Sequence, residues 1–421
     1  MAELNFKAGD YVKLKLALEE IEGGVVENPD SSIVLLKLKS GYNIGINKEN
    51  ILGSRVLKKF KEEESSEVAG LKVEQKKELP AIGLIITGGT IASKASQATG
   101  GVKPISDANE FLSFYPELLD VVRVKKMEIP YKMSSEDMNS EHWIKMAECV
   151  KMMLEDSELK GIIISHGTDT LHYTSSALSF FLRNLNKPVV LTYSQRSIDR
   201  GSSDARLNLL CSARMALSDC AEVILVGHAN SDDEYCYALR GTKVRKLHSS
   251  RRDAFKPVNA EPIAKVWKDK VEFVSKYTKR DNSRKVELDA VFSDKVALVQ
   301  SYPGQSPDIL DFYALKYKGI VISGTGLGHV PENWLPALKK HIKNGLVVCM
   351  TTQCINGRVD EFVYSSARAI ADSGVIYLGD MLSETAFVKL GWVLGHYGWK
   401  AHVKEKMLEN ISGELGERLV E

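Results

Sequence analysis

The chain has 421 residues, with 56 lysines and arginines against 55 aspartates and glutamates, so its formal net charge is +1. Hydrophobic residues make up 44% and charged residues 26%, as in an ordinary globular protein with room for more than one core. This balance argues against a protein that grips nucleic acid over a broad basic surface. No apolar run approaches the roughly 20 residues of a membrane helix, and the first residues lack a signal-peptide pattern, so we expect a cytoplasmic protein without membrane contact.

The first 57 residues differ in pattern from the rest. Val12, Leu14 and Leu16 alternate with polar residues, and a second strand-like run, IVLLKLKSGYNIGI, is broken by a Ser-Gly turn. Short strands with close turns and no helical period predict a small N-terminal β-barrel domain over residues 1–57. Residues 58–78 are mostly charged and have little to bury, so we interpret them as a solvated linker; a surface helix is the alternative.

From residue 79 onward, apolar strand-like runs alternate with helical patterns. This alternation predicts an α/β architecture with mainly parallel sheets covered on both faces. A charged stretch at 268–295 divides the region into two α/β domains, at 79–290 and 291–421. The helices expected in the first of these span 107–119, 135–155, 171–185 and 202–217, and its strands span 82–86, 161–165, 188–193 and 222–227.

The six cysteines are too few for a disulfide framework. Cys149, Cys211, Cys220 and Cys349 sit in apolar runs, which predicts buried thiols. Cys349 and Cys354 do not have CxxC spacing, and His166 and His172 would not share a helix face, so we expect no metal site.

Two short segments carry the chemistry. TGGTIAS (Thr87–Ser93) and SHGTDTL (Ser165–Leu171) each follow an apolar strand and precede a helical pattern. Strand, tight turn and helix in this order place the turn at the carboxyl edge of a parallel sheet, where open α/β folds bind ligands. Thr90 and Thr168 would both be delivered there, which suggests hydroxyl-based acyl transfer; the alternative is that both threonines merely cap helices.

A third segment, KVRKLHSSRR (243–252), is strongly basic. It could contact RNA, or it could be a solvated or active-site-facing loop. If Lys246 reached the Thr168-Asp169 turn, it could accept a proton there, but nothing local in the sequence shows that contact.

The two motifs together closely resemble the bacterial-type L-asparaginase/glutaminase family. SSEDMNSEHW (134–143), KPVVLTYSQR (187–196) and VRKLHSS (244–250) are similar to further family segments, and the resemblance runs through residues 80–421. It implies two α/β domains, a nucleophilic Thr90, and a second catalytic set of Thr168, Asp169 and Lys246. It also implies that Asp169 binds the α-ammonium group of the substrate and Ser135 its α-carboxylate, with Glu136 beside them.

The added β-domain is most similar to that of the glutaminase subunits of archaeal tRNA-dependent amidotransferases. This resemblance implies a homodimer within a heterotetramer, with ammonia from glutamine passing to a partner subunit. The partner would bind tRNA and use ATP and magnesium, while this chain would hold no cofactor. Many asparaginases place a tyrosine just after the first motif, but the loop KASQATGGVKP (94–104) has none, so Lys246 acting through Thr168 is our expected activator of Thr90.

Two other functions remain open from the sequence. One is a free-standing L-asparaginase with an accessory β-domain, since a pocket separates glutamine from asparagine by only about 1–3 kcal/mol per methylene. The other is a non-catalytic scaffold with the same fold.

Overall fold

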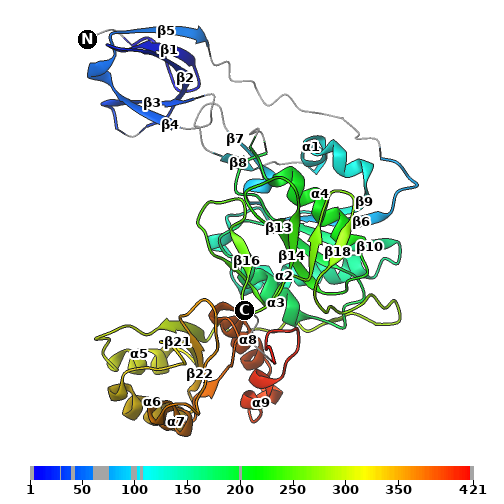
Figure 1. Cartoon of the computed structure of the whole chain (residues 1–421), viewed down its shortest axis with the longest axis vertical. Coiled ribbons are helices and arrows are strands. Elements are labelled where there is room, and N and C mark those ends of the chain that lie inside the picture. The colour runs from blue at the N-terminus through cyan, green and yellow to red at the C-terminus, as the bar shows by residue number, and fades with distance from the viewer. Residues whose placement is uncertain are drawn as a thin grey trace.

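The computed structural model describes residues 4–28, 30–38, 43–59, 75–95, 102–104, 108–198 and 202–417. Most of the expected linker at 58–78, and much of the loop at 94–104, lie outside the described residues. Figure 1 shows an N-terminal β unit at one end, a larger α/β unit in the middle, and a C-terminal α/β unit at the other end. Among the described residues, no helix is both long and apolar enough to cross a membrane.

The N-terminal unit is an antiparallel sheet whose described strands follow the order β4-β3-β2-β1-β5. These strands are β1 (Tyr11–Lys15), β2 (Glu20–Val26), β3 (Ile33–Lys37), β4 (Asn43–Asn47) and β5 (Gly53–Lys58). Its core holds the alternating Val12 and Leu14 together with Leu36, each fully buried, which confirms the period-two pattern. Within the described residues no pairing joins β4 to β5, so closure into a barrel stays a prediction.

The middle unit contains a described eight-stranded sheet in the order β18-β17-β14-β13-β12-β10-β6-β9. The five strands from β13 to β9 run parallel, and β14, β17 and β18 add antiparallel strands at one edge. Their bounds are β6 (Ala81–Ile86), β9 (Arg123–Glu128), β10 (Leu159–Ser165), β12 (Val189–Thr192), β13 (Val223–His228), β14 (Cys236–Arg240), β17 (Ala264–Val266) and β18 (Val271–Phe273). The prediction of a mainly parallel sheet is therefore confirmed, with an antiparallel extension.

Short two-stranded ladders complete this unit. They pair β7 (Ser93–Ala95) with β8 (Val102–Pro104), β11 (Leu182–Arg183) with β19 (Glu287–Leu288), and β15 (Val244–Lys246) with β16 (Phe255–Pro257). The last ladder is a hairpin that carries part of the basic segment at 243–252.

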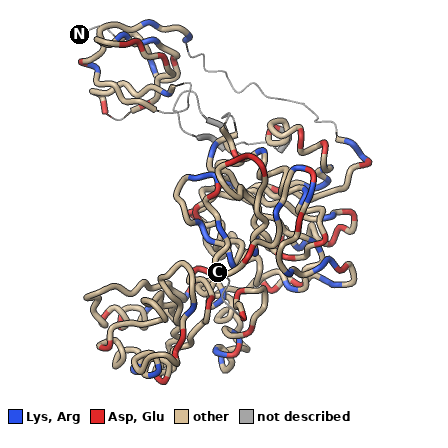
Figure 2. Tube along the Cα trace, viewed as in Figure 1, with Lys and Arg blue, Asp and Glu red and all other residues tan. Residues whose placement is uncertain are grey.

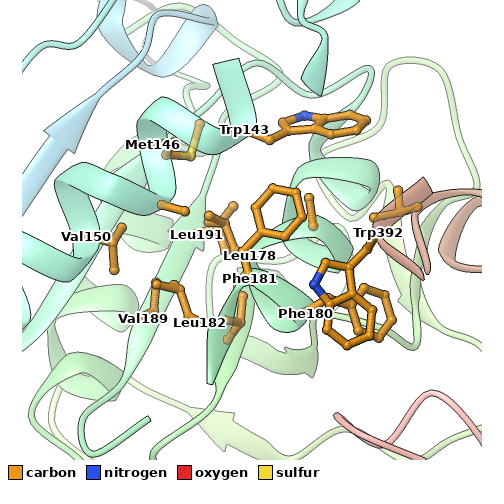
Figure 3. Packing of buried hydrophobic residues seen from close by; sticks show 14 of the residues in the cluster. Trp143, Met146, Val150, Leu178, Phe180, Phe181, Leu182, Val189, Leu191 and Trp392 are labelled. Carbon is orange, nitrogen blue, oxygen red and sulfur yellow. The ribbon is translucent and has the colours of Figure 1, made fainter. Parts of the chain in front are cut away.

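Helices cover both faces of the main sheet because its parallel strands are apolar on both sides. In β10, Ile162 and Ile164 enter one core while Ile163 enters the other. The first core includes Trp143 of α2 and Phe181 of α3, as Figure 3 shows. The helices of this unit are α1 (Ala108–Ser113), α2 (Ser140–Leu154), α3 (Leu171–Phe181) and α4 (Ala205–Ala216).

All four expected helices of this unit are shorter than predicted. Helix α3 ends at Phe181 and not at 185, because Leu182–Arg183 pair with β19, and α4 covers 205–216 and not 202–217. The region 107–119 divides into α1 and a 3-10 turn, η3 (Pro116–Asp120), because a proline disfavours helical geometry at the residue before it. Helix α2 begins at Ser140 and not at 135, since the Asn139 side chain accepts hydrogen bonds from the first turn and caps the helix there. Ser135 instead lies in a 3-10 turn, η4 (Ser135–Asp137).

The C-terminal unit is a parallel sheet whose described strands follow the order β20-β21-β22-β23. Its strands are β20 (Val296–Gln300), β21 (Gly319–Gly324), β22 (Val347–Thr352) and β23 (Ile376–Tyr377), and its helices are α5 (Asp308–Lys316), α6 (Leu335–Lys343), α7 (Ser365–Asp372), α8 (Ser383–Gly395) and α9 (Val403–Leu408). The remaining 3-10 turns are η1 (Lys48–Asn50), η2 (Thr90–Ala92), η5 (Glu332–Trp334) and η6 (Tyr397–Trp399).

Helix α8 joins the two α/β units through a shared core. Trp392 of α8 stacks on Phe180 of α3 with ring centroids 5.6 Å apart, and both residues belong to the first core of the main sheet (Figure 3). Burying two large aromatic side chains in this way contributes several kcal/mol, so the contact fixes the C-terminal unit on the middle one.

Candidate active site

The two motif turns leave the same edge of the main sheet side by side. Strands β6 and β10 are parallel neighbours, with Ile86 opposite Ser165 at their carboxyl ends. The backbone N–H and the hydroxyl of Thr87 both donate to the Ser165 carbonyl, at 3.2 and 2.9 Å. The sequence-based placement of both turns at one carboxyl edge is therefore confirmed.

The glycines of the first motif let the backbones touch. Gly89 has φ +78°, and a Cβ built on it would lie 2.6 Å from Gly167 Cα of the second motif. Gly88 has φ +116°, and its Cβ would lie 2.6 Å from the Met133 carbonyl oxygen. Only glycine fits such contacts without a shift, so Gly89 lets the first turn lie directly against the second, and Gly88 lets it lie against the backbone at Met133.

Thr90 begins the short turn η2 immediately after these glycines. Its side chain is half-buried, and its hydroxyl makes no hydrogen bond to the described residues. The turn itself is held by the Ser93 hydroxyl on Gly89 O at 2.7 Å and by the Tyr115 hydroxyl on Ile91 O at 2.9 Å. Thr90 is thus a hydroxyl on a fixed backbone, not one engaged in capping.

Lys246 connects to the second motif across the sheet edge. Its Nζ donates to Thr168 Oγ1 and to Asp169 Oδ1, both at 2.8 Å. The Lys246 side chain is 9% exposed and Thr168 is buried, whereas the Asp169 side chain is 63% exposed. An inner hydroxyl–ammonium contact therefore adjoins a carboxylate that faces solvent.

Ser135 ties a third segment to the same turn. Its hydroxyl oxygen accepts from the N–H groups of Asp169 and Thr170, at 3.1 and 3.4 Å, which leaves the hydroxyl hydrogen available to donate to a ligand. Thr170 Oγ1 donates in turn to Ser135 O at 2.6 Å. Glu136, the other residue placed here by resemblance, is exposed and makes no hydrogen bond or ion pair to the described residues.

Two histidines lie behind the turn in neutral form. Burial lowers the pKa of His166 to about 4, and its ring nitrogens bond Gly167 O at 2.6 Å and Thr174 Oγ1 at 2.9 Å. Burial, with help from the nearby Arg245 and Lys246 charges, lowers the pKa of His172 to about 3. His166 therefore supports the turn. Within the described ranges no three His, Cys, Asp or Glu side chains gather as a metal site.

The hairpin carrying Lys246 is anchored on the C-terminal unit. Lys243 Nζ reaches Asp380 Oδ2 at 2.6 Å with both side chains buried, and burial lowers the Lys243 pKa while Asp380 opposes that effect. Arg245 pairs with Glu384 at 2.9 Å. Thr385 Oγ1 donates to the Thr242 carbonyl oxygen at 3.0 Å. No local sequence pattern marks these anchors at 380–385, so they cannot be predicted from the sequence.

The cations of the basic segment at 243–252 form ion pairs within the chain. Besides the three cations already described, Arg251 pairs with Asp253 at 2.6 Å and Arg252 with Asp233 at 2.7 Å. Each of these five cations has a carboxylate partner. Lys246 faces the candidate site, as one of the interpretations left open by the sequence expects, whereas residues 247–251 are exposed to solvent.

The buried thiols expected from the sequence are confirmed. Cys149, Cys211, Cys220 and Cys349 are buried and free, as is Cys236, and Cys354 is exposed.

Comparisons with known proteins agree over the whole chain. Family models described as the N-terminal domain of asparaginase and the C-terminal domain of glutaminase/asparaginase match residues 81–279 and 295–407, and a model of the GatD N-terminal domain matches 6–57. The D subunit of the glutamyl-tRNA(Gln) amidotransferase of Pyrococcus furiosus is 45% identical over 99% of this chain and 96% of its own length. The corresponding protein of Thermococcus kodakarensis is 48% identical, over 90% of this chain and 86% of its own. The thermostable L-asparaginase from Thermococcus kodakarensis has a TM-score of 0.70 at 32% identity, over 80% of this chain and 100% of its own.

Proposed function

The chain belongs to the GatD family of glutamyl-tRNA(Gln) amidotransferase components, which has an asparaginase fold, and from this premise we propose that it is the glutaminase subunit of such an enzyme. It would hydrolyse glutamine and supply ammonia for converting glutamyl-tRNA(Gln) to glutaminyl-tRNA(Gln). The observation that carries the proposal is the 2.8 Å contact of Lys246 with both Thr168 and Asp169, beside the turn that presents Thr90.

Thr90 is the proposed nucleophile. Its hydroxyl oxygen attacks the side-chain carboxamide carbon of glutamine, the C–N bond breaks, and the hydroxyl proton leaves with the nitrogen as ammonia. Water then cleaves the resulting ester, which gives glutamate and restores the threonine. Backbone N–H groups at the two glycine-containing turns are suited to stabilise the oxyanion of each tetrahedral intermediate.

Proton transfer is assigned to Thr168 and Lys246. The Lys246 side chain is 9% exposed and its nitrogen lies 2.8 Å from the Thr168 hydroxyl oxygen. In its neutral amine form Lys246 can accept the Thr168 proton while Thr168 takes the proton of the attacking hydroxyl or water, and the ammonium that results can return it. We assign to this pair the activation of Thr90 and of the hydrolytic water. No tyrosine lies at 94–104, and the Tyr115 hydroxyl is already committed to the Ile91 carbonyl.

Substrate recognition follows from charge and exposure. The exposed Asp169 carboxylate is positioned to pair with the α-ammonium group of glutamine, and the Ser135 hydroxyl to donate to its α-carboxylate. We give Glu136 only a supporting place at the rim, since its side chain is exposed and makes no hydrogen bond or ion pair with the described residues.

The assembly is proposed from the family. The relatives carry a name that refers to glutamyl-tRNA(Gln), so we propose a partner subunit that binds most of the tRNA and uses ATP and magnesium, with two copies of each chain. The N-terminal β unit, matched at 6–57 by the GatD N-terminal model, distinguishes this chain from a free-standing asparaginase.

The test is ammonia release from glutamine and from asparagine, by the chain alone and with the partner subunit and glutamyl-tRNA(Gln). We expect slow release by the chain alone and stimulation with glutamine in the complex. Fast, partner-independent release that favours asparagine would instead establish a free-standing asparaginase. No release from either amide under any condition would leave only the scaffold function.

A further inference from the structure

Away from the catalytic edge, the middle unit has a basic hollow at the opposite edge of its sheet. The hollow has a volume of about 860 Å³. It lies at the amino ends of the strands, beside Leu159 at the start of β10 and just before β12. Since the seven residues of β10 span roughly 20 Å, a ligand here cannot take part in chemistry at Thr168.

Cations dominate the lining of this hollow. Six lysines and arginines but only two glutamates line it, although the formal net charge of the whole chain is only +1. Figure 2 shows both signs interspersed along the chain, so a local excess of this kind is not a general property of the molecule. The six cations, which define the basic hollow below, are Lys151, Lys160, Lys187, Arg280, Arg284 and Lys285.

Several of these cations lack a carboxylate partner. Lys151 pairs with Glu155 and Arg284 with Asp281, at 2.6 and 3.6 Å, but Lys160, Lys187, Arg280 and Lys285 form no ion pair with the described residues. The buried Lys187 ammonium donates only to backbone carbonyls, at 2.8 and 3.1 Å. Burial lowers the pKa of Lys187 and of Arg280. The nearby Asp156 and Asp219 act in the opposite direction but compensate this effect only in part.

A second hollow adjoins the first. Its volume is about 440 Å³, and Arg284 lines both. It adds Arg183, Arg240 and Lys276 as cations, with Glu222 already paired to Arg240 at 3.0 Å. Tyr277 also lines it and stacks on Phe273 with centroids 3.9 Å apart.

We propose that the two adjoining hollows form a binding surface for the phosphate backbone of the tRNA that the partner subunit presents, an inference that rests on the proposed function. A series of cations over adjoining hollows, most of them without a carboxylate partner among the described residues, suits a chain of phosphates better than a single small anion. An aromatic ring among the cations also suits RNA, whose unpaired bases stack on such rings. The surface fixes where the tRNA lies on the complex, remote from glutamine hydrolysis.

The experiment measures binding of fluorescently labelled tRNA(Gln) by anisotropy, for the complex with the partner subunit and for this chain alone, between 50 and 200 mM KCl. The test variant is Lys160→Glu with Lys285→Glu, because both side chains are exposed. The matched control is Lys339→Glu with Lys343→Glu, which reverses two exposed lysines on α6 of the C-terminal unit. Thermal unfolding and ammonia release from glutamine are measured on the same samples.

We expect the test variant to bind tRNA at least about tenfold more weakly and to lower the slope of log affinity against log salt by about 1 to 2. The control variant should bind like the wild type, and both variants should hydrolyse glutamine at the wild-type rate when tRNA is saturating. Equal tRNA affinity in the test and control variants would overturn the proposal. The proposal would also be overturned if the test variant failed to assemble with the partner while the chain alone bound tRNA as the wild type does.

The two proposals fail separately. A chain that hydrolyses no glutamine refutes the proposed function, whereas weaker tRNA binding confined to the test variant still supports this surface.

Discussion

Replacing Asp380 by asparagine removes the charge that faces Lys243 in the interface between the middle and C-terminal units. Both side chains are nearly inaccessible, at 2% and 3% exposed, and their atoms are 2.6 Å apart. Removing one partner of such a buried pair costs about 3–5 kcal/mol of stability, because the other charge is left without compensation. Asp380 Oδ1 also accepts the Gly416 N–H at 2.8 Å, and this contact can survive in the amide.

The catalytic effect of this change should exceed its effect on folding. Lys243 lies on the same hairpin as Lys246, so a loosened anchor moves the amine relative to Thr168. A displacement of about 1 Å at a reacting group costs on the order of 10²-fold in rate. We therefore expect Asp380→Asn to lower kcat for glutamine by about 10²-fold at a temperature where the variant is still folded.

The control for Asp380→Asn is Leu338→Ala, which removes a fully buried side chain from the core of the C-terminal unit. It should cost a similar 2–5 kcal/mol in urea unfolding without touching the hairpin. Its kcat should stay near that of the wild type. Equal losses of kcat in the two variants would refute the idea that Asp380 positions Lys246, since both losses would then follow from lower stability.

Three further changes test the site. Lys246→Met should lower kcat by about 10²–10⁴-fold with unchanged circular dichroism, and a kcat within a few-fold of wild type would remove Lys246 from the proton-transfer role. Gly89→Ala should unfold or inactivate the chain, because the added Cβ would meet Gly167. The control Gly304→Ala, at φ +81° with nothing within 4 Å of the added Cβ, should lower the free energy of unfolding by only about 1 kcal/mol. Equal melting temperatures of the two variants would contradict this. Because the folded-state pKa of His166 is lowered from 6.5 to about 4, the unfolded chain takes up the proton first. The contribution of His166 to the free energy of unfolding is therefore fully present above pH 6.5 and decreases by on the order of 3 kcal/mol as the pH falls to 4. Urea unfolding across this range should be flatter in His166→Gln, and parallel curves would show that another group is responsible.

Local patterns in the sequence were sufficient for the strands that hold the motifs. The apolar runs before Thr87 and Ser165 became β6 and β10, because a strand buried on both faces needs a continuous apolar run. Adjacency in the chain also placed Thr168 beside Asp169. The end of the helix predicted at 107–119 was wrong, since Pro116 outweighs the helical period around it.

Contacts between distant segments were beyond sequence reasoning. Lys246 and Asp169 are 77 residues apart, and only the family resemblance brought them together before the fold was known. Asp380 is 137 residues from Lys243, and neither residue stands in a recognisable motif. The unpaired cations at the amino edge of the sheet come from separate segments, so their local excess is hidden in a balanced total charge.

Ammonia release from glutamine by Thr90→Ala, in complex with the partner subunit and glutamyl-tRNA(Gln), tests the central claim most directly. If Thr90 is the nucleophile, the rate falls by at least about 10³-fold while the complex still assembles, and Thr90→Ser recovers part of the loss. Ammonia release by Thr90→Ala at the wild-type rate would contradict the account, since the acyl-enzyme would then have to form elsewhere or not at all.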